Sequence, residues 1–242
     1  MDFLELKKGI KNLCTDFMKD MEIDPTTGLL KNTHLRFSGF PYIGANYVNA
    51  PIKILFIPLD CGIDELSKQN TYHSFESREN IFKEGNLTFN DHIAGIYATT
   101  LLIIKDRMQL QEAWERLQSQ NGYTVKKAIT NVADSLPRNL MTYVAYENRF
   151  RFVTKDRDAR TGGKDRLYIN PQRERQLLMD EVKVFNPDVI VFQGKEGLWN
   201  CGVDVLKKKY NVIEAMHPSA WQYKANKLQY IVEHIAPQIS VK

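Results

Sequence analysis

The chain has little cysteine, and its cysteines form none of the usual patterns. Its 242 residues include three, at Cys14, Cys61 and Cys201, which are far apart and form no CxxC pair. An odd number of distant cysteines argues against a disulfide framework and against a zinc site. Reduced thiols are the ordinary state in the cytoplasm, so we expect a cytoplasmic protein.

Long apolar runs and glycine-rich phosphate loops are missing as well. No stretch approaches the ~20 apolar residues that a membrane span needs. The N-terminal segment 1–13 is amphipathic with early acidic residues, unlike a signal peptide. Neither GxGxxG nor GxxxxGK[ST] occurs, which counts against a nucleotide cofactor. We therefore expect no membrane partner, no metal and no cofactor.

The composition is that of an ordinary soluble globular protein. Hydrophobic residues make up 43% and charged residues 26% of the chain, which is long enough to bury a substantial core. The net charge of +4 permits a polyanionic partner without requiring one. We expect one monomeric domain over 1–242, with an N-terminal helix and loop at 1–50 and a core at 51–235.

Short apolar segments alternate with segments of helical periodicity. Runs rich in β-formers predict buried strands at 53–58, 125–131, 188–192 and 211–216. Helices are predicted at 3–21, 91–104, 106–119, 171–185, 195–209 and 224–235. This alternation predicts an α/β fold, a three-layer α/β/α sandwich around a central four-stranded, mostly parallel sheet.

A basic insertion is predicted at 149–175. It carries nine arginines and lysines beside the aromatic residues Phe150, Phe152 and Tyr168, a mixture that suits contacts with phosphate groups. Acidic residues interrupt the segment, so a solvated loop is the alternative interpretation.

Three predicted strands lead into polar residues. Asp60 follows the first strand, Asn131 ends the second and His217 follows the fourth. Parallel strands place their carboxyl ends at one edge of the sheet, where α/β folds bind ligands. A hydrolytic or base-recognition site would suit these residue types. Alternatively, Asp60 caps a helix, Asn131 belongs to a turn and His217 is structural.

The segments IPLDCG, ITNVADSLPRN, PDVIVFQG and HPSAW, in this order, resemble the motifs of the uracil-DNA glycosylase superfamily over about residues 50–235. Asp60 matches the Asp of GQDPYH in the uracil-specific branch, and His217 to Ser219 match HPSP. The segment around Asn131 is similar to TNVVKCRPPGNR of the iron–sulfur branch. Pro58, Cys61 and Ala220 depart from these motifs, and the cluster cysteines of that branch are absent.

The resemblance implies a role for each site residue. Asp60 would stabilise the cationic sugar and orient water, and His217 would donate a hydrogen bond to the departing base. Asn131 would read the pairing edge of the flipped base, and Tyr72 or Phe75 would stack on it. The DNA contacts implied are Arg138, Lys195, Ser219, Trp221 and Gln222, of which Trp221 and Gln222 could wedge into the duplex.

Three functions follow as hypotheses. The first is a glycosylase that removes uracil or another altered base from DNA. The second is an antiviral glycosylase for a bulky phage base such as glucosylated hydroxymethylcytosine, which would need small residues around a wide pocket. The third is a DNA-binding module without catalysis. Phe75 and Trp221 could equally be ordinary core residues.

Overall fold

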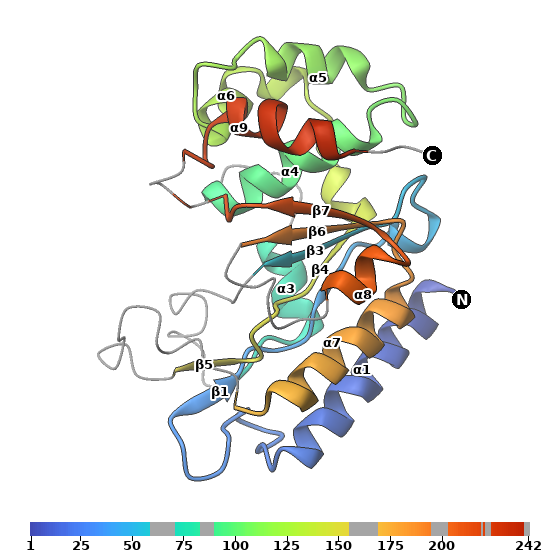
Figure 1. The fold of residues 1–242 in the computed structure, drawn as a ribbon, viewed down its shortest axis with the longest axis vertical. Helices are drawn as coiled ribbons and strands as arrows, with labels where there is room; N and C mark the ends of the chain where they lie inside the picture. The colour runs from blue at the N-terminus through green and yellow to red at the C-terminus, as the bar shows by residue number, and fades with distance from the viewer. Residues whose placement is uncertain are drawn as a thin grey trace.

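The computed structural model describes residues 1–58, 71–82, 90–154, 169–194, 203–218, 220 and 224–239. Within this part of the chain, five strands form the central sheet in the order β2-β4-β3-β6-β7. The strands are β2 (Tyr42–Ile43), β3 (Ile54–Pro58), β4 (Val144–Tyr146), β6 (Val189–Gln193) and β7 (Asn211–Ala215). All neighbours pair in parallel except β2, which is antiparallel to β4. Figure 1 shows the carboxyl ends of β3, β6 and β7 pointing the same way.

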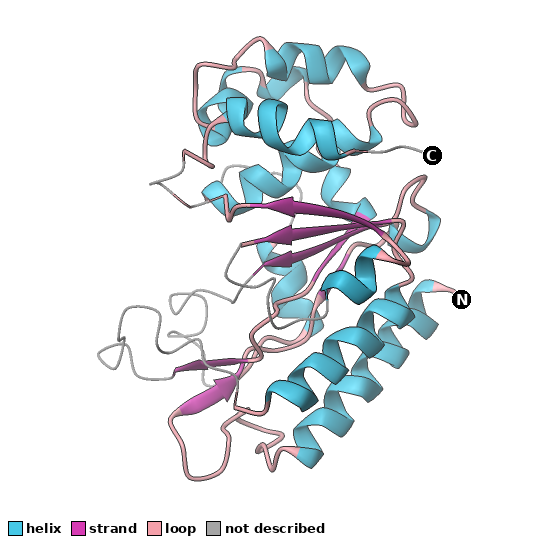
Figure 2. Ribbon diagram, in the orientation of Figure 1, coloured by secondary structure: helices cyan, strands magenta, loops and turns pink. Residues whose placement is uncertain are grey.

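Helices cover both faces of this sheet, as Figures 1 and 2 show. One face carries α4 (Asp91–Ile104), α5 (Gln111–Gln118), α6 (Val125–Asn131) and α9 (Leu228–Tyr230), which continues through Ile231–Ile235. The other carries α1 (Phe3–Asp20), α7 (Pro171–Phe185) and α8 (Val203–Lys207). The short helix α3 (Phe75–Ile81) packs against the edge strand β2.

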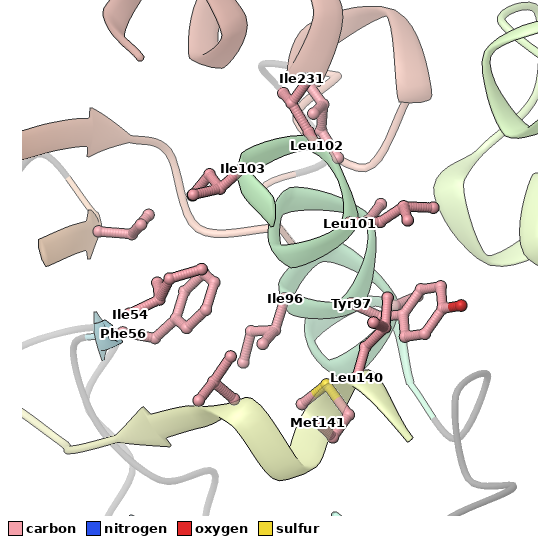
Figure 3. Close-up of a cluster of buried hydrophobic side chains, with 14 of the residues drawn as sticks. Ile54, Phe56, Ile96, Tyr97, Leu101, Leu102, Ile103, Leu140, Met141 and Ile231 are labelled. Atoms are coloured by element: carbon pink, nitrogen blue, oxygen red, sulfur yellow. The ribbon is translucent and has the colours of Figure 1, made fainter. Parts of the chain in front are cut away.

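Alternating side chains of each strand divide the core in two, because successive residues of a strand point to opposite faces. Ile54 and Phe56 of β3 pack toward α4, whereas Leu55 and Ile57 pack toward α1 and α7. Helix α4 is buried from His92 to Ile104, so it is apolar on all sides. Figure 3 shows its side chains reaching both the sheet and the C-terminal helical segment.

A small second sheet lies beside the main one. Strand β1 (Leu35–Phe37) pairs antiparallel with β5 (Phe152–Thr154). The segment predicted as a basic insertion therefore contains part of a sheet, and its C-terminal part belongs to α7. Arg149 and Arg151 are 2% and 0% exposed, so these two arginines do not offer their charge to phosphate at the surface. Residues 155–168 of the predicted insertion lie outside the described residues.

The mixed α/β class and the strands at 54–58, 189–193 and 211–215 confirm the expectations for those segments. The strand predicted at 125–131 is wrong, because these residues form α6. Thr124 caps this helix by accepting a hydrogen bond from Lys127 N, and Val125, Ala128 and Ile129 are buried at helical spacing. Strand β4 takes its place as the second parallel strand, and the antiparallel edge strand β2 brings the described sheet to five strands instead of four.

The predicted helices 91–104 and 171–185 coincide with α4 and α7, and that at 3–21 ends one residue earlier as α1. The helix expected at 106–119 spans 111–118, and the one expected at 224–235 begins at Leu228. Only 203–207 of the helix expected at 195–209 can be compared, as α8. Among the described residues, no helix combines the length and apolar character needed to cross a membrane.

Candidate functional site at the carboxyl edge of the sheet

The order of the strands has a topological switch point between β3 and β6. The chain passes from β3 to β4 on one side, and then crosses to β6 on the other side of β3. Connections leave two adjacent strands in opposite directions at such a switch point, so the space beyond their carboxyl ends is open to ligands. Pro58 of β3 and Gln193 of β6 are paired at this end.

His92 lies in the first turn of α4 and reaches the end of β6. Its Nε2 is 2.9 Å from Gln193 Oε1, and both side chains are buried. Burial lowers the pKa of His92 to about 4, and the positive charge of Arg78 also lowers it, although the hydrogen bond to Gln193 opposes the shift. His92 is therefore neutral at pH 7, with Nε2 donating to the amide oxygen of Gln193 and Nδ1 unprotonated.

His217 lies beside His92, with 4.4 Å between the two ring centroids. It follows β7 after Met216, whose N–H donates to Tyr230 Oη at 2.8 Å. The carbonyl of His217 accepts a hydrogen bond from Ala220 N at 2.8 Å. These backbone contacts fix the segment that carries the imidazole, so its position is set by the fold.

Pro218 docks this segment onto α4. A Cβ atom placed on Gly95 would lie 2.5 Å from Pro218 Cβ and 2.6 Å from its Cγ. Gly95 follows His92 by three residues, so both lie on the same face of the helix. The absence of a side chain at Gly95 thus lets Pro218 approach α4 closely and holds His217 next to His92.

Strand β4 brings a second set of groups to this edge. Glu147 N and Arg149 N donate to the carbonyls of Phe56 and Pro58, both at 2.9 Å, so the pairing with β3 continues past the end of β4. Asn148 lies between these two residues and is buried.

An aromatic ring connects β4 with the histidines. The ring centroid of Tyr146, the last residue of β4, is 5.5 Å from that of His92. The guanidinium carbon of Arg78 is 5.5 Å from the same Tyr146 centroid. A buried ring and a cation therefore flank the histidine pair on the β4 side.

A buried ionic cluster supports β4 from the other face of the sheet. Arg151 forms ion pairs with Glu147 and with Glu181 of α7, and Cys14 Sγ of α1 contacts Glu181 Oε1 at 3.4 Å. Burial raises the pKa of Glu147 well above its usual range; Arg151 opposes this shift and the charge of Glu181 adds to it. The cluster ties the end of β4 to both helices of the α1/α7 layer.

Asn131 lies elsewhere than expected. It is the last residue of α6, is exposed, and donates from Nδ2 to Gln120 Oε1 at 2.9 Å. Its predicted place at the sheet edge depended on a strand that is a helix, so that placement is wrong. Asn148 is the asparagine that follows the second parallel strand.

Phe75 packs in the core, and the half-buried Tyr72 packs against it. Phe75 is 8% exposed and stacks on Phe40, with ring centroids 4.8 Å apart, while Lys7 Nζ lies 5.3 Å from its centroid. Tyr72 packs its edge against Phe37 and Phe40, and its hydroxyl donates to Pro25 O at 3.2 Å. Because Phe75 is buried between these neighbours, the expectation that it stacks on a base is wrong, and the core interpretation holds for it.

The remaining expected residues divide into two groups. Arg138 is exposed in the turn that follows Pro137, whose carbonyl accepts a hydrogen bond from Tyr97. Asp60, Lys195, Ser219, Trp221 and Gln222 lie outside the described residues.

Sequence reasoning missed three members of this edge. Gln193 stands inside PDVIVFQG, His92 opens an apolar helix, and Asn148 follows the short apolar run Val144–Tyr146. Polar residues after an apolar run were the available signal for Asn148, but the run is only three residues long and Glu147 comes first.

No group of three or more metal-binding side chains occurs in the described part of the chain. No protein-family model matches the sequence, and no curated protein is similar enough to indicate a relative.

Proposed function

We propose that this protein is a DNA glycosylase that hydrolyses the N-glycosidic bond of an altered base, without metal or cofactor, and leaves an abasic site. The observation that carries the proposal is the pair of imidazoles at the carboxyl edge, with 4.4 Å between the ring centroids of His92 and His217. It lies at the edge where a doubly wound sheet binds ligands, and β3 leads directly into Asp60.

The reaction requires charge stabilisation on both sides of the breaking bond. The sugar becomes cationic, and the carboxylate of Asp60 would stabilise that charge and orient the attacking water. The departing base becomes anionic, and an N–H of His217 would donate to its carbonyl oxygen. His92, being neutral, places no positive charge beside His217, so it does not oppose a proton on that residue.

Recognition of the base is proposed for Asn148 in place of Asn131. Its amide offers one acceptor and two donors, which is enough to read the pairing edge of a pyrimidine. The backbone bonds of Glu147 and Arg149 to β3 hold Asn148 in a fixed position. Preorganisation of this kind favours one hydrogen-bonding pattern over others.

The bulk around the histidines favours a small base such as uracil. Tyr146 is a buried aromatic residue whose ring centroid is 5.5 Å from that of His92. A pocket for a glucosylated base would need small side chains at this position. An antiviral glycosylase for such a base is the second candidate, and a non-catalytic DNA-binding module is the third. We propose that the enzyme acts as a cytoplasmic monomer that flips one nucleotide out of DNA.

The test uses labelled oligonucleotides, one with uracil and one with glucosylated hydroxymethylcytosine, followed by hot alkali, which breaks the strand at abasic sites. We expect cleavage at uracil by the wild type. We expect a loss of roughly a hundredfold or more in rate in Asp60→Asn and His217→Ala. Cleavage only at the bulky base would assign the antiviral function instead.

Two further variants test whether individual residues of the carboxyl edge contribute to activity. His92→Asn and Asn148→Ala alter the edge described above, and the exposed Asn131→Ala is the matched control for Asn148→Ala. We expect Asn131→Ala to keep wild-type activity. If neither oligonucleotide is cleaved while both are bound tightly, the glycosylase proposal is overturned in favour of the binding module.

A further inference from the structure

A groove with a volume of about 930 Å³ lies at the amino end of the sheet, opposite the histidine pair. The segments that begin β3, β6 and β7 form its floor together with the end of α4, through Ile52, Val189, Val212 and Ile103. Sites for small molecules typically measure roughly 300–1,000 Å³. The groove therefore has the size of a ligand site, and these four aliphatic side chains offer an apolar floor within a mainly polar lining.

Its rim is basic. The cationic residues that line it are Arg107, Lys207, Lys208 and Lys209. Lys207 forms an ion pair with Glu214, whereas Arg107, Lys208 and Lys209 are exposed and have no ion pair within the described chain. Three uncompensated cations around one groove attract an anion.

The acidic residue of the lining is already engaged. Asp188 Oδ2 accepts a hydrogen bond from Lys53 N at 2.8 Å, which joins the beginnings of β3 and β6. This bond turns one oxygen of the carboxylate toward the backbone. Asp188 keeps its negative charge, but four cationic side chains line the groove with this one carboxylate, so the lining is basic.

The lysines are not needed to shield the edge strand at this point. Edge strands commonly use lysine to prevent pairing with other chains. Here Gln238 occupies the edge of β7, because its Oε1 accepts from Glu214 N and its Nε2 donates to Glu214 O, both at 2.9 Å. The same contacts fix the C-terminal wall of the groove.

We propose that this groove binds a small organic phosphate, with its apolar body on the floor and its phosphate among Arg107, Lys208 and Lys209. Such a site uses side-chain cations, so it needs no glycine-rich loop. It lies at the opposite end of the strands from the glycosylase site proposed above and does not depend on that function.

Calorimetric titration of the full chain with AMP, adenosine and inorganic phosphate tests the proposal. We expect AMP to bind about tenfold more tightly than either fragment, because it alone uses both floor and rim. Lys208→Glu with Lys209→Glu should weaken AMP binding by about tenfold or more. Lys126→Glu with Lys127→Glu makes the same charge change on the exposed face of α6 and should leave it unchanged.

Thermal unfolding of each variant shows whether the fold is intact, and Arg107→Gln provides a second, milder variant that removes one cation of the rim. Absence of AMP binding by the wild type would overturn the proposal, as would equal losses in the two lysine pairs. If only a DNA oligonucleotide binds, and that binding falls in Lys208→Glu with Lys209→Glu, the groove is a polyanion surface and the proposal is wrong.

Discussion

At the scale of single residues, Gly95 controls how closely the segment after β7 approaches α4. A side chain there would overlap Pro218, whose ring lies 2.5 Å from the position of the added Cβ. We expect Gly95→Ala to destabilise the protein by roughly 1–3 kcal/mol, because overpacking a close contact outweighs the gain in helix propensity. Urea unfolding measures this change. Gly122→Ala is the control, since a Cβ atom there meets nothing within 4 Å; an equal loss in both variants would contradict the argument.

The buried imidazole of His92 makes stability depend on pH. Its pKa is about 4 in the folded chain and ~6.5 when unfolded, so the unfolded chain binds more protons between these values. The contribution to stability is complete above pH ~6.5 and is lost as the pH falls toward 4. Between pH 7 and pH 5 we expect this residue to account for a loss of about 2 kcal/mol.

Urea unfolding of wild type and His92→Gln at both pH values measures that contribution as the difference between their pH responses. The wild type also contains His73, whose pKa burial lowers to about 3, but His73 is common to both proteins and cancels. His34→Gln replaces an exposed histidine and is the control. Its free energy of unfolding should change between the two pH values as much as that of the wild type. An unchanged pH response in His92→Gln would show that His92 is not the cause.

The asparagines show where residue-level reasoning fails. Asn131 has the neighbours of a motif, yet it lies on an exposed helix end, whereas Asn148 follows a strand too short to stand out. A motif read from sequence fixes residue order, but the local structure decides which side chain reaches the edge. The place of His217 at this edge could be predicted because it follows a clear five-residue strand with only Met216 between them.

At the scale of elements, the buried Arg151 joins β4 to α7. It pairs with Glu147 and Glu181, and all three side chains are nearly inaccessible to water. Arg151→Met removes the positive charge that the two buried carboxylates share. We therefore expect this variant to lower the free energy of unfolding by about 3–5 kcal/mol. The combined variant with Glu147→Gln and Glu181→Gln should recover part of this loss. Urea unfolding gives both values.

The exposed pair of Arg116 and Glu112 on α5 provides the comparison for that measurement. Arg116→Met removes the same kind of charge at the surface, where an ion pair is worth roughly 0–1 kcal/mol. If Arg116→Met and Arg151→Met lower the free energy of unfolding by similar amounts, burial is not the reason that the Arg151 cluster stabilises the protein.

Element prediction succeeded where periodicity was sustained and failed where it was short. Helices α4 and α7 extend over 14 and 15 residues with clear caps, and both were predicted at their correct bounds. The seven residues of α6 contain a β-branched start and a mixed pattern that also suits a strand. Strand β4 is held by its neighbours β2 and β3, and such tertiary pairing leaves little trace in three residues.

At the scale of the whole molecule, the two ends of the parallel strands carry surfaces of different character. The carboxyl edge carries the pair of His92 and His217, and the amino end carries the basic groove. The parallel arrangement followed from the alternation of strands and helices, but the order β4-β3-β6-β7 did not, because it depends on which side of β3 the chain crosses. That order puts the open position between β3 and β6.

If the protein binds DNA at the site proposed above, DNA should protect the backbone at the carboxyl edge of the sheet. Hydrogen exchange should be measured with His217→Ala, which we expect to bind a uracil oligonucleotide and to cleave it roughly a hundredfold more slowly. The amides of Gly194 and Met216 lie at the carboxyl edge, so their exchange should slow when DNA binds. The amides of Lys209 and Tyr210, at the amino end, should keep their exchange rates. Slowing confined to the amino end would move the DNA site to the basic groove and would contradict the assignment of the carboxyl edge as the nucleic-acid site.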